Sequence, residues 1–135
     1  MKERKPNRKS LIKKLDSLVI EIIRLRDNYT CQHCGKKVDK SNAHVSHVIP
    51  RSAGNKLRWD LNNLKVLCFH CHINWWHKNP TESGEWFKQK FPVRWKYLEE
   101  NKGLYQFKTF QLEILRDELE AILENEKQRN EEKAF

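Results

Sequence analysis

The chain has 135 residues, a formal net charge of +9, and 38% hydrophobic against 33% charged side chains. It contains no apolar run near the ~18 residues of a membrane span, and no apolar segment follows its basic N-terminus as in a signal peptide. We therefore expect one domain with a helical extension, located in the reducing cytoplasm and not in a membrane. The core is small for this length, so a bound metal would help to stabilise it.

The positive charge is distributed unevenly along the chain. Residues 113–133 carry eight acidic and four basic side chains, a local charge of −4, so the remainder carries +13. A basic body with a separate acidic helix is typical of a nucleic-acid-binding protein. A basic surface that only keeps the protein in solution is the alternative.

The first half of the chain predicts one helix and two short strands. Residues 1–9 are basic and aperiodic, which predicts a flexible arm that can contact phosphates. From Ser10, interpreted as an N-cap, apolar residues recur at helical spacing to about Asp27, and Asn28-Tyr29 should end that helix. Alternation over 43–49 predicts a strand that ends at Pro50, and a loop separates it from a second strand over 64–67.

The second half predicts helices. A short helix should run through His77, and two more, over 81–91 and 93–101, should lie on either side of Pro92. Residues 110–133 form the longest regular element, with leucine and isoleucine on one face. Its acidity would repel a phosphate backbone, so we expect it to pack or to self-associate as a homodimer. The predicted divisions are 1–9, 10–103 and 104–135.

Four tryptophans fall on the predicted short helices, and they admit two interpretations. They are Trp75, Trp76, Trp86 and Trp95. A platform on which nucleic-acid bases stack is one interpretation. Packing in the core is the one that we favour, because large aromatic side chains at helical spacing usually fill a core.

All four cysteines and all six histidines lie between Cys31 and His77. The cysteines form two C-x-x-C pairs, Cys31 with Cys34 and Cys68 with Cys71. Each pair forms a tight turn that aims two thiolates at one point, and two such turns complete the tetrahedral sulfur set that suits structural Zn²⁺. Disulfides and free thiols are the alternatives, which a reducing compartment disfavours.

A histidine, an asparagine and a second histidine are threaded between these pairs. His47 precedes V-I-P-R, Asn63 opens N-L-K-V-L-C, and His72 directly follows C-F-H-C. In this order the pieces resemble the HNH endonuclease family. The resemblance covers residues 31–77 and implies a ββα-metal core, an α+β fold of two strands and a helix that holds one divalent cation.

The flanks resemble a narrower group more loosely. Residues 15–18, 23–27 and 57–60 are similar to segments of the NinG/Rap-type phage recombination nucleases. This second resemblance implies branched or junction DNA as the substrate, and the cytoplasm of the phage's host as the location.

The residue types suit the hydrolysis of a phosphodiester bond, which needs a base for water and a cation for the developing charge. His47 suits the base because an imidazole titrates near neutral pH. His72 suits a cation ligand, with His77 as a second ligand and Mg²⁺ or Mn²⁺ as the ion. The resemblance implies that Asn63 holds the loop that orients the base.

The chain departs from the family at Ser46, where HNH nucleases usually carry Asp or His as a metal ligand. His44 lies on the same strand face and is the available substitute, unless it is simply a surface residue. The departure also admits a site that binds DNA without cutting it. His33 and His70 lie inside the cysteine turns, and we interpret them as turn residues or phosphate contacts.

Three basic residues near the predicted strands are candidates for contact with the DNA backbone, namely Arg51, Arg58 and Lys65. The sequence therefore favours a zinc-stabilised HNH endonuclease, a hydrolase that acts on DNA. A non-catalytic zinc-dependent DNA-binding module is the first alternative. A subunit that acts only through its long helix is the second.

Overall fold

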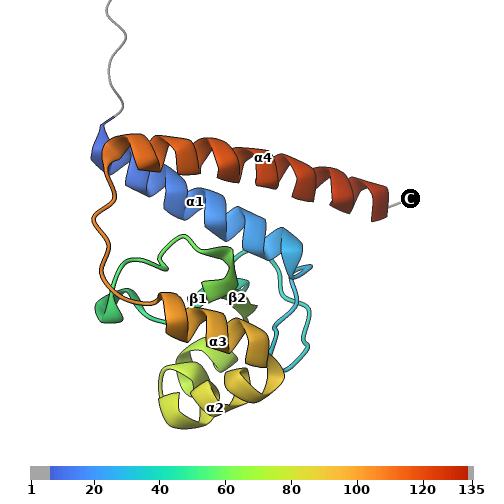
Figure 1. Ribbon diagram of the computed structural model, residues 1–135. Helices are drawn as coiled ribbons and strands as arrows, with labels where there is room; N and C mark the ends of the chain where they lie inside the picture. The colour runs from blue at the N-terminus through green and yellow to red at the C-terminus, as the bar shows by residue number, and fades with distance from the viewer. Residues whose placement is uncertain (1–6, 134–135) are drawn as a thin grey trace, which may run out of the picture. The chain divides into compact units, whose positions relative to one another are not determined.

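The computed structural model describes residues 7–133, which divide into two compact units. One unit contains the chain up to Ile22 and from Gln106 onward, and the other is Ile23–Tyr105. The second unit contains a two-stranded sheet and short helices, and a long helix ends the chain (Figure 1). The predicted α+β class is therefore confirmed. Within residues 7–133 we find no helix with both the length and the apolar character needed to span a membrane.

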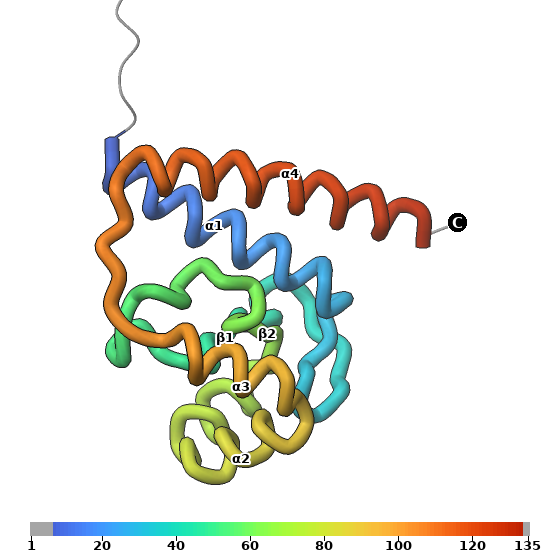
Figure 2. The backbone as a smooth tube through the Cα atoms, in the orientation of Figure 1, coloured from blue at the N-terminus to red at the C-terminus, as the bar shows by residue number. Residues whose placement is uncertain are grey.

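The first unit is a pair of helices, α1 (Arg8–Arg26) as far as Ile22 and α4 (Thr109–Lys133). The two lie side by side (Figures 1 and 2), since Arg8 donates to Thr109 at 3.3 Å near one end and Lys127 lies 4.0 Å from Glu21 further along. Each buries an apolar stripe, Leu11, Leu15 and Leu18 on α1 and Leu112, Leu119 and Leu123 on α4. The guanidinium of Arg8 donates to the carbonyl of Phe107 at 2.6 Å, which joins the first turn of α1 to the segment before α4.

The start of α1 differs from the prediction. The helix begins at Arg8, so Ser10 is not its N-cap. Asn7 takes that position, because its side-chain oxygen accepts from the backbone N–H of Lys9 at 2.9 Å and so satisfies a donor in the first turn. Arg8 and Lys9, assigned to the basic arm, are therefore helical, and positions 1–6 of that arm lie outside the described residues.

The second unit is built on an antiparallel pair, β1 (His44–His47) and β2 (Leu64–Leu67), with Ser46 opposite Lys65. Strand β2 has the predicted bounds, but β1 is shorter than the predicted 43–49. The ladder stops because the N–H of Ile49 bonds to the side-chain oxygen of Asn63 at 2.7 Å and not to a backbone carbonyl. An asparagine side chain thus fixes where the strand ends.

The core of the second unit lies between the strands and two short helices, α2 (Pro80–Lys90) and α3 (Pro92–Asn101). Each begins one residue before the prediction, since proline fits the first turn of a helix, where its missing N–H is not needed. Phe87 and Leu98 pack there with Val48 and Leu57. Partly buried aromatic and aliphatic side chains surround them, including Trp76, Trp86 and Trp95. The preferred interpretation of these three tryptophans is confirmed.

Candidate zinc cluster and active site

The four cysteines converge on one point. Their sulfur atoms all lie within 4.8 Å of one another, and the Sγ atoms of Cys34 and Cys68 are 3.9 Å apart. A tetrahedral zinc ion with Zn–S bonds of ~2.3 Å holds its sulfurs ~3.8 Å apart. The arrangement therefore fits a structural zinc ion with no open coordination position.

The thiols of this cluster differ in how readily they ionise. Burial alone would raise the pKa of Cys31. Backbone N–H groups of the two C-x-x-C turns, here called the zinc knuckles, donate to its sulfur and lower the pKa to about 7. Burial and the neighbouring sulfurs raise the pKa of Cys71 above its ordinary value. Four thiolates so close together repel one another, so a bound cation is what would let all of them ionise.

His33 connects the cysteine cluster to the aromatic side chains of the same unit. Its Nδ1 lies 3.3 Å from the sulfur of Cys71, and its ring stacks on Trp75 with centroids 3.6 Å apart and planes 10° apart. Trp86 meets the same ring edge-on. With Nδ1 directed at a sulfur, His33 is better placed to donate to the cluster than to bind a phosphate.

Asn63 is fully buried, and its side chain joins two segments of the chain. Besides accepting from Ile49 N–H, its amide donates to the carbonyl of Ile49 at 3.0 Å and to that of Leu57 at 3.2 Å. All three of these hydrogen bonds join the Asn63 side chain to backbone groups. Asn63 therefore fixes the end of β1 against the loop that contains Leu57, so that neither can move without breaking a buried bond.

His47 is oriented by that same loop. Its Nε2 lies 3.3 Å from the backbone carbonyl of Arg58, the residue after Leu57. A carbonyl only accepts, so this contact places the proton on Nε2, and in a neutral imidazole Nδ1 is then the basic atom. A series of contacts therefore leads from Asn63 to His47 through two adjacent loop residues.

Two arginines hold the segment that contains Asn63. Arg26, in the last turn of α1, donates to the carbonyls of Leu61 and Leu64, both at 2.7 Å. Arg94 of α3 donates to the carbonyls of Asn62 at 2.9 Å and Leu64 at 3.1 Å. Neither arginine was predicted from the sequence, because nothing in the local pattern distinguishes it from a solvated basic residue.

His72 lies on a π-helix, His70–Trp76, and not on the α-helix expected from the sequence. The N–H of His77 donates to the carbonyl of His72 at 3.1 Å, an i→i+5 bond. In an α-helix, residues five apart point about 140° away from each other. The wider turn instead brings their side chains together, with the two Nε2 atoms 3.0 Å apart.

A third histidine reaches His72 from strand β1. Nδ1 of His44 lies 3.0 Å from Nδ1 of His72, so each nitrogen of His72 faces another imidazole. Burial, together with smaller contributions from the nearby His77, His44, Lys65 and His47, lowers the pKa of His72 to about 4. His72 is therefore neutral at physiological pH, the form in which imidazole binds metals.

Residues 31–74 match the HNH endonuclease family. The chain carries an HNH domain. The match contains the four cysteines, His47, Asn63 and His72, and it confirms the resemblance expected over 31–77; His77 lies just beyond its end. It indicates nuclease activity, and HNH nucleases act on DNA. No curated protein and no solved structure matches this chain.

At the position where HNH nucleases usually carry a metal ligand, this HNH domain has Ser46, a buried serine that lies opposite a buried lysine of β2. The ammonium of Lys65 donates to the hydroxyl of Ser46 at 3.3 Å and lies 3.3 Å from the ring centroid of Trp76. Lys65 is 0% exposed, and this burial lowers its pKa well below the usual value. The prediction that Lys65 contacts DNA is therefore wrong: all of β2 is buried, so its side chain cannot reach a phosphate.

The other two predicted DNA contacts lie nearer the surface of the HNH domain. Arg51 is exposed directly after Pro50. Arg58 is half-buried, with its guanidinium 5.1 Å from the ring of Trp59. Both stay predictions.

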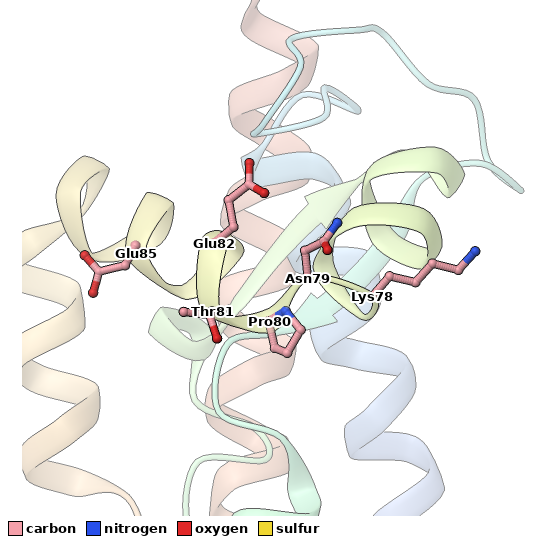
Figure 3. A pocket seen from close by; sticks show the side chains of 6 residues that line it. All are labelled: Lys78, Asn79, Pro80, Thr81, Glu82 and Glu85. Carbon is pink, nitrogen blue, oxygen red and sulfur yellow. The ribbon is translucent and has the colours of Figure 1, made fainter.

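An open hollow lies where α2 begins, and Figure 3 shows the side chains that line it, including Glu82 and Glu85. The two carboxylates outnumber the one lysine of this lining, Lys78, and would repel a phosphate backbone. The hollow is therefore a poor place for DNA.

Proposed function

We propose that the HNH domain is an endonuclease that hydrolyses DNA phosphodiester bonds with one divalent cation. The observation that carries the proposal is the series of contacts from the buried Asn63 through Leu57 and Arg58 to His47. A histidine held by backbone contacts in one tautomer is the arrangement that a general base needs.

In the proposed reaction, Nδ1 of His47 takes a proton from water as that water attacks the phosphorus. His72 holds the cation, which we assign to Mg²⁺ or Mn²⁺ on the family resemblance. When bound, such an ion stabilises the charge that develops on the phosphate and on the leaving oxygen. Asn63 does not touch the substrate; it keeps the loop that positions His47 in place.

We further propose branched or junction DNA in phage recombination as the substrate. The looser resemblance of residues 15–18, 23–27 and 57–60 supports this choice. A reducing cytoplasm would suit the protein, since it keeps the four thiolates available to zinc.

The test is a cleavage assay on labelled plasmid, single-stranded and four-way-junction DNA. Zinc-loaded protein is incubated with Mg²⁺ or Mn²⁺, or briefly with EDTA, and its zinc content is measured afterwards. We expect metal-dependent cutting that falls about 10²–10⁴-fold in His47→Ala. His70→Ala, an exposed histidine of the second knuckle, is the matched control and should cut normally. Cutting that survives His47→Ala would sink the proposal.

A second candidate is a zinc-dependent module that binds DNA without cutting it. The observation in its favour is Ser46, whose hydroxyl is already bonded to Lys65 and offers no carboxylate to a metal. In the same assay it predicts that the protein shifts every DNA in a gel and cuts none with either cation.

We also propose that α4 joins two copies of the chain. Phe110 and Ile114, one turn apart on α4, are 57% and 53% exposed. Sedimentation should give a dimer mass that Ile114→Glu reduces to that of a monomer, and a monomeric wild type would contradict this.

A further inference from the structure

The three clustered histidines make two separate contacts, each with two nitrogen atoms 3.0 Å apart, one between two elements and one along the π-helix. His44 and His72 come from different elements, a strand and the π-helix, and present their Nδ1 atoms to each other at 3.0 Å. Adjacent ligands of an octahedral ion with metal–nitrogen bonds of ~2.1 Å lie ~3.0 Å apart. The pair therefore already has the spacing of two ligands to one ion.

His77 is on the other side of His72. Its Nε2 lies 3.0 Å from Nε2 of His72, the nitrogen that faces away from His44. The two nitrogens of one imidazole point in divergent directions, so one ion cannot bind both. If His72 binds an ion through Nδ1, its Nε2 carries the proton and donates to His77, as metal-bound histidines commonly do to a neighbouring acceptor.

The surroundings offer this ion no acidic ligand. Within residues 7–133, three or more potential ligands converge at the cysteines and nowhere else, so no Asp or Glu joins the histidines in such a group. Ser46 is occupied by the buried Lys65. Imidazole nitrogen suits Ni²⁺, Co²⁺ and Zn²⁺, whereas Mg²⁺ prefers carboxylate oxygen and water.

We propose that His44 and His72 bind the domain's second metal through their Nδ1 atoms, that His77 fixes the tautomer of His72, and that the site selects transition metals over Mg²⁺. This changes the role of His77 from the predicted ligand to a positioning residue, makes His44 a ligand, and narrows the proposed catalytic ion from Mg²⁺ or Mn²⁺ to Mn²⁺. The inference rests on the proposed function only in identifying this ion with the catalytic one.

The first test measures metal binding without DNA. Tag-free protein with zinc in its cysteine site, verified by native mass spectrometry, is titrated with Ni²⁺ and with Mg²⁺ in a calorimeter. We expect one Ni²⁺ per chain and much weaker Mg²⁺ binding. His77→Ala should weaken Ni²⁺ binding about 10-fold, the loss typical of an outer partner, and His44→Ala should weaken it considerably more. His77→Gln, which keeps an acceptor, should recover part of the loss, and His70→Ala should change nothing.

The second test reads the tautomer of His72 directly. Long-range ¹H–¹⁵N correlation spectra of the same zinc-loaded protein should show the proton of His72 on Nε2, and His77→Ala should weaken that preference. A proton on Nδ1, unchanged Ni²⁺ affinity in His44→Ala, or equal affinity for Mg²⁺ and Ni²⁺ would overturn the inference.

The outcomes separate this inference from the proposed function. Ni²⁺ binding that depends on His44, without any DNA cutting, would support the metal site and contradict the proposed nuclease activity. Mg²⁺-dependent cutting that persists in His44→Ala would do the reverse.

Discussion

The cysteine cluster and the histidine cluster of the HNH domain are built in different ways. Each cysteine pair is local, since two residues three apart in one turn aim both sulfurs at a point. The histidines depend on contacts between separate segments: the carbonyl of Arg58 orients His47, and His44 of β1 meets His72 of the π-helix. The cysteine site therefore depends mainly on the spacing of its residues in the sequence. The histidine site depends on how firmly the surrounding backbone is held in place.

The largest expected effect is the loss of the fold when the cysteine cluster loses its metal. A closed four-sulfur site contributes its binding energy to folding, of the order of 10 kcal/mol. We expect Cys68→Ser, or prolonged chelation of the wild type, to abolish the cooperative thermal unfolding of Ile23–Tyr105. Circular dichroism and tryptophan fluorescence would measure it. His70→Ala changes the same knuckle without removing a sulfur and should unfold normally.

The next largest expected effect is a difference in stability between Asn63→Ala and His47→Ala. Both should lose cutting, but only Asn63→Ala should also lose stability, by about 3 kcal/mol, because the buried backbone groups of Ile49 and Leu57 would lose their partners. Urea unfolding of both variants checks this. Equal stabilities would show that Asn63 does not hold the loop.

A smaller effect is expected at His33, where the contact with the Cys71 sulfur and the stacking on Trp75 can be tested separately. His33→Phe keeps a flat ring against Trp75 but removes the nitrogen that faces Cys71. Because His33 would donate to a zinc ligand, its loss should speed zinc release to a chelator about 10-fold with little change in the fold. Zinc release at the wild-type rate would mean that stacking is the whole contribution of this residue.

The smallest effect concerns the basic residues. Arg51→Ala should weaken DNA binding a few-fold and reduce its salt dependence, because one phosphate contact is lost. Lys65→Met should leave both unchanged, since Lys65 is fully buried. Fluorescence anisotropy at several salt concentrations would compare them, and weaker binding by Lys65→Met in a correctly folded protein would contradict its assignment to the interior.

The sequence predicted those features that depend on residues close together in the chain. The C-x-x-C spacing located the cysteine cluster, and β-prone residues between turn signals gave β2 its bounds. Lys65 was misplaced because a lysine in a short strand ordinarily faces solvent, whereas here all of β2 is covered. The carbonyl contacts of Arg26 and Arg94 had no signal in the sequence, since each joins residues distant in the chain. The π-helix had none either, because its residue pattern does not differ from that of another short helix.

The measurement that tests the central claim most directly is the nicking rate of plasmid DNA by the wild type and by His47→Ala, with equal zinc content and equal melting temperature. The cysteine cluster would then be identical in both, and only the proposed base would differ. We predict metal-dependent nicking by the wild type and a rate about 10²–10⁴-fold lower in His47→Ala. Equal rates in the two proteins would contradict the account.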